Sequence, residues 1–175
     1  ELTESGEIVA TTRAERGETI RLGTYARLIT VSRKLLIDDD MNMLGDITSA
    51  MGQAAAQTEA EIMVGLLTSP PNLSDGTSVF HSTRGNIAGS SGAPDATTLA
   101  AARLAMRNFN GLDGATFINA VPRYLLVGPT RETAAEQVLA ALYPADVGDV
   151  NPFTGKLTLL VEPRIEDGRW FLFAD

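Results

Sequence analysis

One long helix dominates the predicted organisation of the chain. Between residues 41 and 67, mostly apolar side chains recur in steps of three and four, as along one face of an amphipathic helix: Leu44, Ile47, Met51, Ala55, Thr58, Ile62 and Leu66. Thr68-Ser69-Pro70-Pro71 ends the helix, because proline lacks an N–H group and restricts the residue before it. Glycines inside it each weaken it by up to about 1 kcal/mol relative to alanine. Tertiary packing must therefore hold this helix in place.

The residues before this helix are poor in core-forming side chains. Residues 1–24 alternate polar and charged residues with few aliphatics, which predicts an extended or hairpin-like arm that turns near Arg16-Gly17. Residues 25–32 contain Tyr25, Leu28, Ile29 and Val31 with polar residues between them, a pattern typical of a strand. An arm, a strand and a long helix are thus expected in this order.

The remainder of the chain predicts a mixed α/β region over residues 68–175. It begins with a long polar loop over 68–95, and Asp95 is placed to cap a helix that ends at Asn110-Gly111. Further elements follow in order: strands at 116–118 and 124–127, a helix from Gly128-Pro129 to Pro144, a strand at 157–161, and a hairpin that turns at Asp167-Gly168 and ends in a strand from Trp170 to Phe173. The predicted fold class is α+β.

Composition excludes several classes of protein. The 175 residues contain no cysteine, which removes disulfides, thiolate metal sites and a cysteine nucleophile. The net charge of −8 argues against sequence-specific binding of nucleic acid as the main activity. No apolar stretch of 18 residues predicts a membrane span, and no signal peptide is visible.

The charges are segregated along the chain. Residues 1–34 carry six bases and five acids, and residues 35–67 carry six acids and no base. This segregation favours pairing of the arm, through Arg13, Arg16 and Arg21, with the acidic helical segment, within one chain or between chains. The alternative is two solvated surfaces.

The three consecutive acids Asp38, Asp39 and Asp40 stand where the long helix begins. They could ligate Ca²⁺ or Mg²⁺ as part of a divalent-cation-binding module, but the alternate spacing, glycine and distal glutamate of a Ca²⁺ loop are missing. Acids at a helix start also cap its free N–H groups and face the positive end of its dipole. Asp39 or Asp40 is therefore predicted to be the N-cap, with a partner's bases as a third possibility.

Few residues suggest catalysis. His81, the single histidine, lies in the polar loop, and a hydrolase using it with a serine and an aspartate is the enzymatic alternative. No serine lies in a G-x-S-x-G or S-x-x-K motif, so a loop histidine without a catalytic role is favoured. Arg103 and Arg107, four residues apart on the helix after Asp95, could face a partner's carboxylates or solvent. The residues predict no catalytic, cofactor-binding or metal-binding site.

Six segments taken in order resemble a known family: Glu4-Ser5-Gly6-Glu7-Ile8, the run from Tyr25 to Asp39, Asp75-Gly76 with Phe80-His81 and Gly85-Asn86, Pro122 to Val127, Asn151-Pro152, and Trp170 to Asp175. In this order they resemble the major head (capsid) subunit of Mu-like prophages, which is often fused behind a Clp-type prohead protease. More distantly they resemble tailed-phage capsid proteins of the Hong Kong 97 type. The resemblance covers nearly the whole chain, although no single motif in it is specific.

The resemblance implies a non-enzymatic structural protein that assembles into an icosahedral shell around DNA. Residues 1–24 would be an extended arm over a neighbour, residues 25–67 a peripheral strand and spine helix, and residues 68–175 an axial domain. Identical subunits in pentamers and hexamers would be the partners, with a scaffold or prohead protease and decoration proteins as further ones. The protein would be made in the bacterial host cytoplasm and reside in the virion capsid. Because relatives continue beyond the Trp170 strand and carry a preceding protease part, the chain is expected to be trimmed at both ends.

Overall fold

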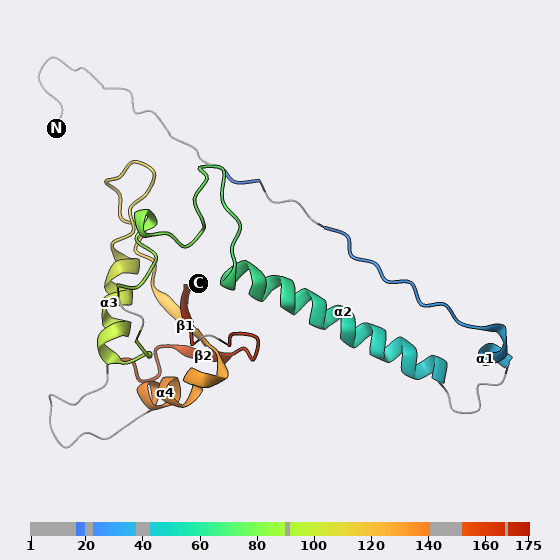
Figure 1. Ribbon diagram of the computed structural model, residues 1–175. Helices are drawn as coiled ribbons and strands as arrows, with labels where there is room; N and C mark the ends of the chain where they lie inside the picture. The colour runs from blue at the N-terminus through green and yellow to red at the C-terminus, as the bar shows by residue number, and fades with distance from the viewer. Residues whose placement is uncertain (1–16, 20–22, 38–42, 90–91, 141–151, 167) are drawn as a thin grey trace, which may run out of the picture.

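The computed structural model describes residues 17–19, 23–37, 43–89, 92–140, 152–166 and 168–175 (Figure 1). Its helices and strands are α1 (Arg33–Ile37), α2 (Met43–Thr68), the single 3₁₀ turn η1 (Ser82–Arg84), α3 (Ala96–Arg107), β1 (Pro122–Val127), α4 (Pro129–Leu139), β2 (Thr158–Val161) and β3 (Trp170–Ala174). The predicted mixture of helices and strands is confirmed.

The three strands form one small mixed sheet in the order β2-β1-β3. β1 pairs in parallel with β2, and α4 makes the crossover between them. β3 pairs with β1 in the antiparallel direction, so that Leu125 of β1 lies between Leu159 and Leu172. The sheet therefore has β1 at its centre, and no other described strand pairs with β2 or β3 at its edges.

One face of the sheet is closed by α3 and α4. Side chains alternate between the faces of a strand, and Leu125 and Val127 of β1 are fully buried on this face. They pack into a core with Leu99 of α3, Ala135 of α4 and Phe153. We call this unit of the sheet with α3 and α4 the body.

A close approach of the backbone fixes the turn between β1 and α4. A Cβ atom added at Gly128 would lie 1.9 Å from the carbonyl oxygen of Ile165, which is far inside van der Waals contact. Only glycine fits at this position. Pro129 then occupies the first turn of α4, where its missing N–H group costs nothing.

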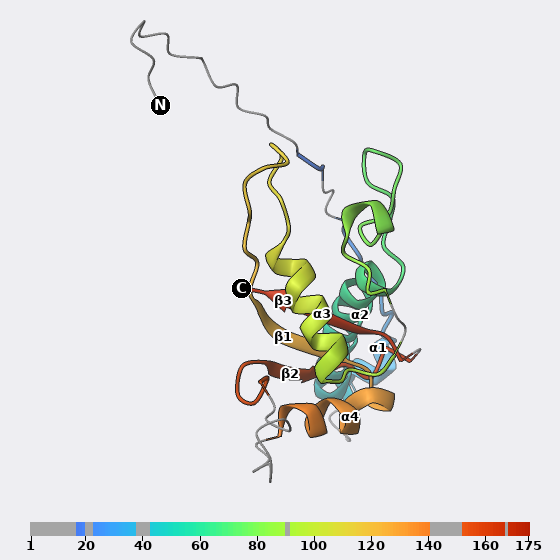
Figure 2. The ribbon, with the colours of Figure 1, turned by 90° about the vertical axis from the view of Figure 1, so that its left-hand side faces the viewer.

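The other face of the sheet lies toward α2, and Figure 1 shows α3 and α2 on opposite sides of the strands, which Figure 2 views from the side of α3. Phe171 and Phe173 are on this outer face with their ring centres 6.4 Å apart, and Phe80 from the loop after α2 lies 5.5 Å from Phe171. Arg169 donates to the carbonyl oxygen of Thr68 at 2.6 Å, which ties the end of α2 to β3. The outer face is thus only partly covered, by one loop and one end of a helix.

The predicted long helix is confirmed as α2, which has 26 residues. Of its side chains that the structure describes, Val64 alone is buried, and it lies near the end of α2 that meets the sheet. The rest of α2 extends away from the body (Figure 1). Among the described residues, the tertiary packing that was predicted to hold the helix is therefore found at the last turns of α2.

Two shorter predictions are also confirmed. Asp95 caps α3, because its side chain accepts from the Thr98 N–H at 2.7 Å while the Thr98 hydroxyl accepts from the Asp95 N–H at 2.9 Å. Residues 72–89 form a loop without a regular strand, apart from an isolated bridge between Asn72 and Ser78.

Several predicted strands and ends are wrong. Residues 25–32 form no strand, because a strand needs a hydrogen-bonding neighbour and none of the described segments pairs with them. Residues 116–118 form only an isolated bridge, between Phe117 and Asn110. The hairpin at Asp167-Gly168 is absent, since β3 pairs with β1 rather than with residues 164–166. α4 ends at Leu139, five residues before the predicted stop at Pro144.

Candidate functional site

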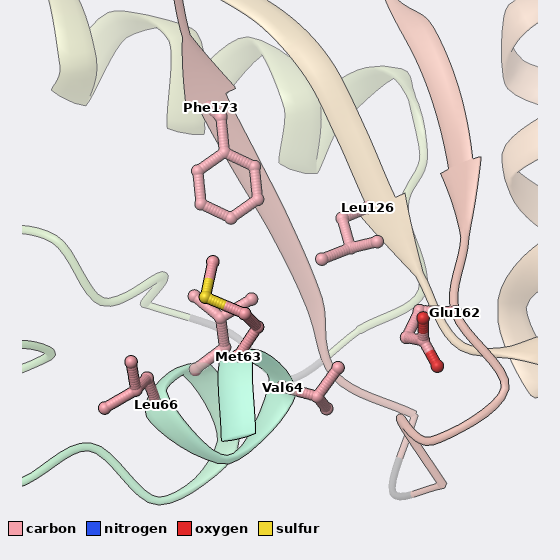
Figure 3. Close-up of a pocket in the computed structure, with 7 residues that line it drawn as sticks. Met63, Val64, Leu66, Leu126, Glu162 and Phe173 are labelled. Carbon is pink, nitrogen blue, oxygen red and sulfur yellow. The ribbon is translucent and has the colours of Figure 1, made fainter. Parts of the chain in front are cut away.

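An apolar groove lies between the last turns of α2 and the outer face of the sheet (Figure 3). Its volume is about 430 Å³, and its walls are Met63, Val64, Leu66, Leu67, Leu126, Glu162 and Phe173. Val64 anchors the helix, whereas Met63 and Leu66 remain 61% and 49% exposed. Exposed apolar side chains gathered around a hollow are typical of a surface that binds another protein segment.

The groove carries one charged group, the carboxylate of Glu162. Burial acts to raise the pKa of Glu162, but hydrogen bonds from the side chain and backbone of Arg164 outweigh it and hold the pKa below its ordinary value. The side-chain contact between the two is 2.8 Å long. The negative charge of this carboxylate is therefore already balanced by Arg164. The residues that line the groove include no acid–base pair for catalysis.

The exposed part of α2 continues the apolar surface away from the groove. Ile62 and Met51 lie on the helix at helical spacing and are exposed, and Asp46, Glu59 and Glu61 are its acids. α2 contains no base. A helix that is apolar along one stripe and acidic elsewhere can contact a partner that offers both apolar and basic side chains.

The loop over residues 72–89 is held by its own polar groups. Arg84 pairs with Asp75 at 2.5 Å and donates to the carbonyl oxygen of Ser78 at 3.1 Å. Hydrogen bonds from the backbone and side chain of Thr77, together with Arg84, lower the pKa of Asp75. Glu18, from the described part of the arm, accepts from the Ser74 N–H and hydroxyl at 3.0 and 2.7 Å. The loop is thus a defined structure that also fixes one point of the arm.

His81 has a structural role in this loop. Its Nδ1 accepts from the Thr83 N–H at 3.3 Å and lies 2.8 Å from the Thr83 hydroxyl, so the imidazole caps η1. Its backbone N–H donates to Asn86 at 3.0 Å. Neither ring nitrogen contacts a serine or aspartate in these described bonds, so they do not form the Ser–His–Asp arrangement of the enzymatic alternative.

A second apolar surface lies on a hairpin-like loop after α3. Within residues 108–121 the side chains of Leu112, Phe117 and Ile118 are each 60% or more exposed. Asp113 stiffens the turn by accepting from Thr116 and Ala115, and these hydrogen bonds, led by the Thr116 hydroxyl, lower its pKa. The loop therefore holds apolar side chains in solvent on a defined backbone.

Arg103 and Arg107 both make contacts with other residues of the same chain. The guanidinium of Arg103 lies 4.7 Å from the ring centre of Phe153, a cation–π contact on the core. Arg107 donates to Asn119 at 2.9 Å, which ties α3 to the end of the hairpin-like loop. The two arginines do not form a joint site, and whether either one meets a partner's carboxylates stays a prediction.

The other predicted site residues lie outside the described part of the chain. These are Arg13, Arg16 and Arg21 of the arm and Asp38, Asp39 and Asp40 before α2. Among the described residues, no group of three histidine, aspartate or glutamate side chains is arranged to hold a metal ion. Searching the same residues gives no helix with the length and apolar character needed to cross a membrane.

Sequence reasoning missed the groove and the hairpin-like loop. Leu66 belongs to the apolar face predicted for the long helix and Met63 does not, and the predicted spacing does not show which part of the helix stays uncovered. The sequence predicts a strand at residues 116–118, whereas Phe117 and Ile118 are exposed apolar residues in a loop after the turn at Asp113-Gly114. Phe117 and Ile118 follow a turn, and the sequence offers no partner strand for them. That combination could have indicated a surface contact.

Comparison with family models explains why so much apolar surface is left open. The model described as phage capsid protein matches residues 16–175, which is most of the chain. Comparison with curated proteins and with solved structures gave no match. Proteins that build shells bury apolar surface against neighbours, in keeping with a groove, a projecting helix and an apolar loop on one subunit. The chain belongs to the phage capsid protein family and is a structural, non-enzymatic component of the phage head.

Proposed function

We propose that the chain is the major subunit of an icosahedral head of the Hong Kong 97 type, similar to that of Mu-like prophages, which encloses phage DNA. Membership of the capsid family supports the general part of this proposal. The observation that carries the finer part is α2, a helix of 26 residues with a single buried described side chain. Such a helix suits a spine that many neighbours contact.

The proposed division of the chain is the one that the resemblance implies, and the length of α2 supports its spine helix. Residues 1–24 act as an extended arm, residues 25–67 form the peripheral strand and the spine helix, and residues 68–175 form the axial domain. Residues 25–32 have the composition of a strand but do not pair with any of the described residues. A strand that forms on assembly fits this division.

Attraction between unlike charges supports a contact between copies. The arm carries Arg13, Arg16 and Arg21, and α2 carries acids without a base. Many modest contacts of this kind, repeated in pentamers and hexamers, add up to a stable shell. Scaffold or prohead protease and decoration proteins are further partners of the proposed shell.

Electron microscopy and light scattering of the full-length protein test this function. Particles tens of nanometres across, with five-fold and six-fold positions, are expected under assembly conditions. A uniformly monomeric protein under these conditions would contradict the proposal.

Charge reversal tests the contribution of the arm. Arg13→Glu, Arg16→Glu and Arg21→Glu are each expected to lower particle yield, because each replaces an attraction to the acidic helix by a repulsion. Lys156→Glu is the matched control, since Lys156 is an exposed base outside the arm. Equal yields for the arm variants and this control would remove the arm from the mechanism.

A further inference from the structure

We propose that the groove at the end of α2 receives residues 25–29 of a second copy of the chain. This inference rests on the proposed function and goes beyond it, because it assigns one contact to named residues on both sides. The occupant is the segment Tyr25-Ala26-Arg27-Leu28-Ile29.

The groove supplies one half of the contact. Met63 and Leu66 stand open to solvent on α2, and Leu126 and Phe173 form the opposite wall (Figure 3). The two strands that form one wall of the groove are held by the core, and Val64 is the buried contact that attaches the helix wall, so the groove exists before binding. A preformed apolar groove loses little entropy when a segment enters it.

Residues 25–29 supply the other half. Tyr25 is 72% exposed and Leu28 is 91% exposed, although both are large apolar side chains. The backbone of residues 23–32 is neither helix nor strand. An extended segment with unburied apolar side chains is the kind of ligand that inserts into a groove beside a sheet.

Charge complementarity favours this pairing over other apolar partners. Residues 23–34 contain Arg27, Arg33 and Lys34 and no acid, while all the charged residues of α2 are acids. Glu59 is four residues before Met63 and so lies on the same face of the helix, beside the groove. The carbonyl end of α2, which has no base in its last turn, also attracts a cation. Arg27 of the incoming segment would therefore face Glu59 while Leu28 enters the groove.

A second copy is the occupant because the chain's own segment does not cover the groove. Leu28 would not be 91% exposed if it were packed on α2 of the same molecule. Figure 1 shows the segment leading into α1 beside the end of α2 that is remote from the sheet. The family also builds its structures from many identical chains.

Disulfide crosslinking tests the contact directly, since residues 1–175 contain no cysteine. One preparation carries Leu28→Cys and a second, distinguishable by mass, carries Met63→Cys. The two are mixed under assembly conditions and oxidised, and the mixed dimer is measured on a non-reducing gel. A disulfide requires Cα atoms within about 7 Å of each other, so the mixed dimer should form several-fold more than with Leu104→Cys in place of Leu28→Cys. Leu104 is the matched control because it is a leucine that is 60% exposed and lies on α3, outside the groove.

Charge exchange gives a second measurement that does not depend on cysteine geometry. Arg27→Glu added to the Leu28→Cys chain should lower the mixed dimer several-fold, and Glu59→Arg added to the Met63→Cys chain should restore it. Both residues are exposed, so neither change disturbs the core.

Three outcomes separate this inference from the proposed function. Particles that form without the mixed dimer overturn the groove contact and leave the function intact. Mixed dimers without particles support the contact and contradict the proposed shell. A disulfide that forms only within single chains carrying both Leu28→Cys and Met63→Cys overturns the inference, because the groove would then be filled by the chain's own segment.

Discussion

The body and α2 bury their apolar residues in different ways. In the body, Leu125, Val127 and Leu99 are fully buried within one chain. On α2, Met51, Ile62 and Leu66 are exposed although they lie on the predicted apolar face of the helix, and Met63 beside the groove is exposed as well. The sheet with α3 and α4 can thus fold as a unit by itself, whereas α2 holds apolar surface in reserve for contacts with other molecules. The difference separates residues that set stability from residues that set assembly.

Truncation in the body should have the largest effect. Leu125→Ala removes a fully buried side chain from the central strand, and such changes cost about 2–5 kcal/mol of unfolding free energy. Urea unfolding followed by the fluorescence of Trp170, the single tryptophan, measures this loss, since Trp170 packs against the core. Leu104→Ala is the control, because an exposed leucine should cost far less. Equal losses would mean that the core lies elsewhere.

A smaller loss is expected where the backbone is tightly packed. Gly128→Ala places a methyl group against the Ile165 carbonyl and should cost about 1–3 kcal/mol, as overpacking does. Gly52→Ala on α2 is the matched change, since no atom lies within 4 Å of its added Cβ. It should instead stabilise the helix by up to about 1 kcal/mol. The same urea titration measures both, and a destabilised Gly52→Ala would show that α2 is packed after all.

Polar substitution on α2 should separate stability from assembly. Met63→Ser alters an exposed side chain, so the unfolding free energy of the subunit should change by no more than about 0.5 kcal/mol. Particle yield by light scattering should nevertheless fall, because the groove loses apolar surface. Leu104→Ser, with similar exposure on the body, should keep the yield. An unchanged yield for Met63→Ser would place the groove outside the assembly contacts.

The smallest effect is the loss of stability at low pH when Asp113 of the hairpin-like loop is protonated. The folded pKa of Asp113 lies below its ordinary value of 3.8, chiefly because of the Thr116 hydroxyl. The stabilisation is therefore complete above pH 3.8 and is lost as the pH falls through the lowered pKa. Titration of the Asp113 carboxyl by NMR should show a pKa below 3.8, and Thr116→Ala should move the pKa back toward 3.8. A titration that Thr116→Ala leaves unchanged would contradict the role of the hydroxyl.

Local patterns predicted the helices better than the sheet. The spacing of α2 and its terminal prolines lie within one segment, as does the capping of α3 by Asp95, and both were predicted from sequence. The pairing of β3 with β1 depends on residues far apart in the chain, so the turn at Asp167-Gly168 wrongly predicted a local hairpin. Residues 25–32 have strand-forming side chains, but a strand also needs a partner, which the sequence of one chain does not name.

The candidate site was predictable only in part. An apolar face of α2 was visible in the sequence. The groove also needs Leu126 and Phe173 from the sheet. These residues are far from Met63 in the chain, so the sequence does not show that they lie beside it. Charge segregation pointed to the arm and the acidic helix as contact surfaces, and that interpretation stays a prediction for Arg13, Arg16 and Arg21.

The attachment of α2 near Val64 has a geometric consequence. At about 1.5 Å per residue, Met43 lies roughly 32 Å along the helix axis from Val64, so a tilt of about 10° at Val64 moves Met43 by roughly 5.5 Å. The core residues Leu125 and Val127 lie on the opposite face of the sheet and need not move. Subunits joined through α2 can therefore meet at different angles, and one sequence can serve both flat and sharply curved regions of a closed surface.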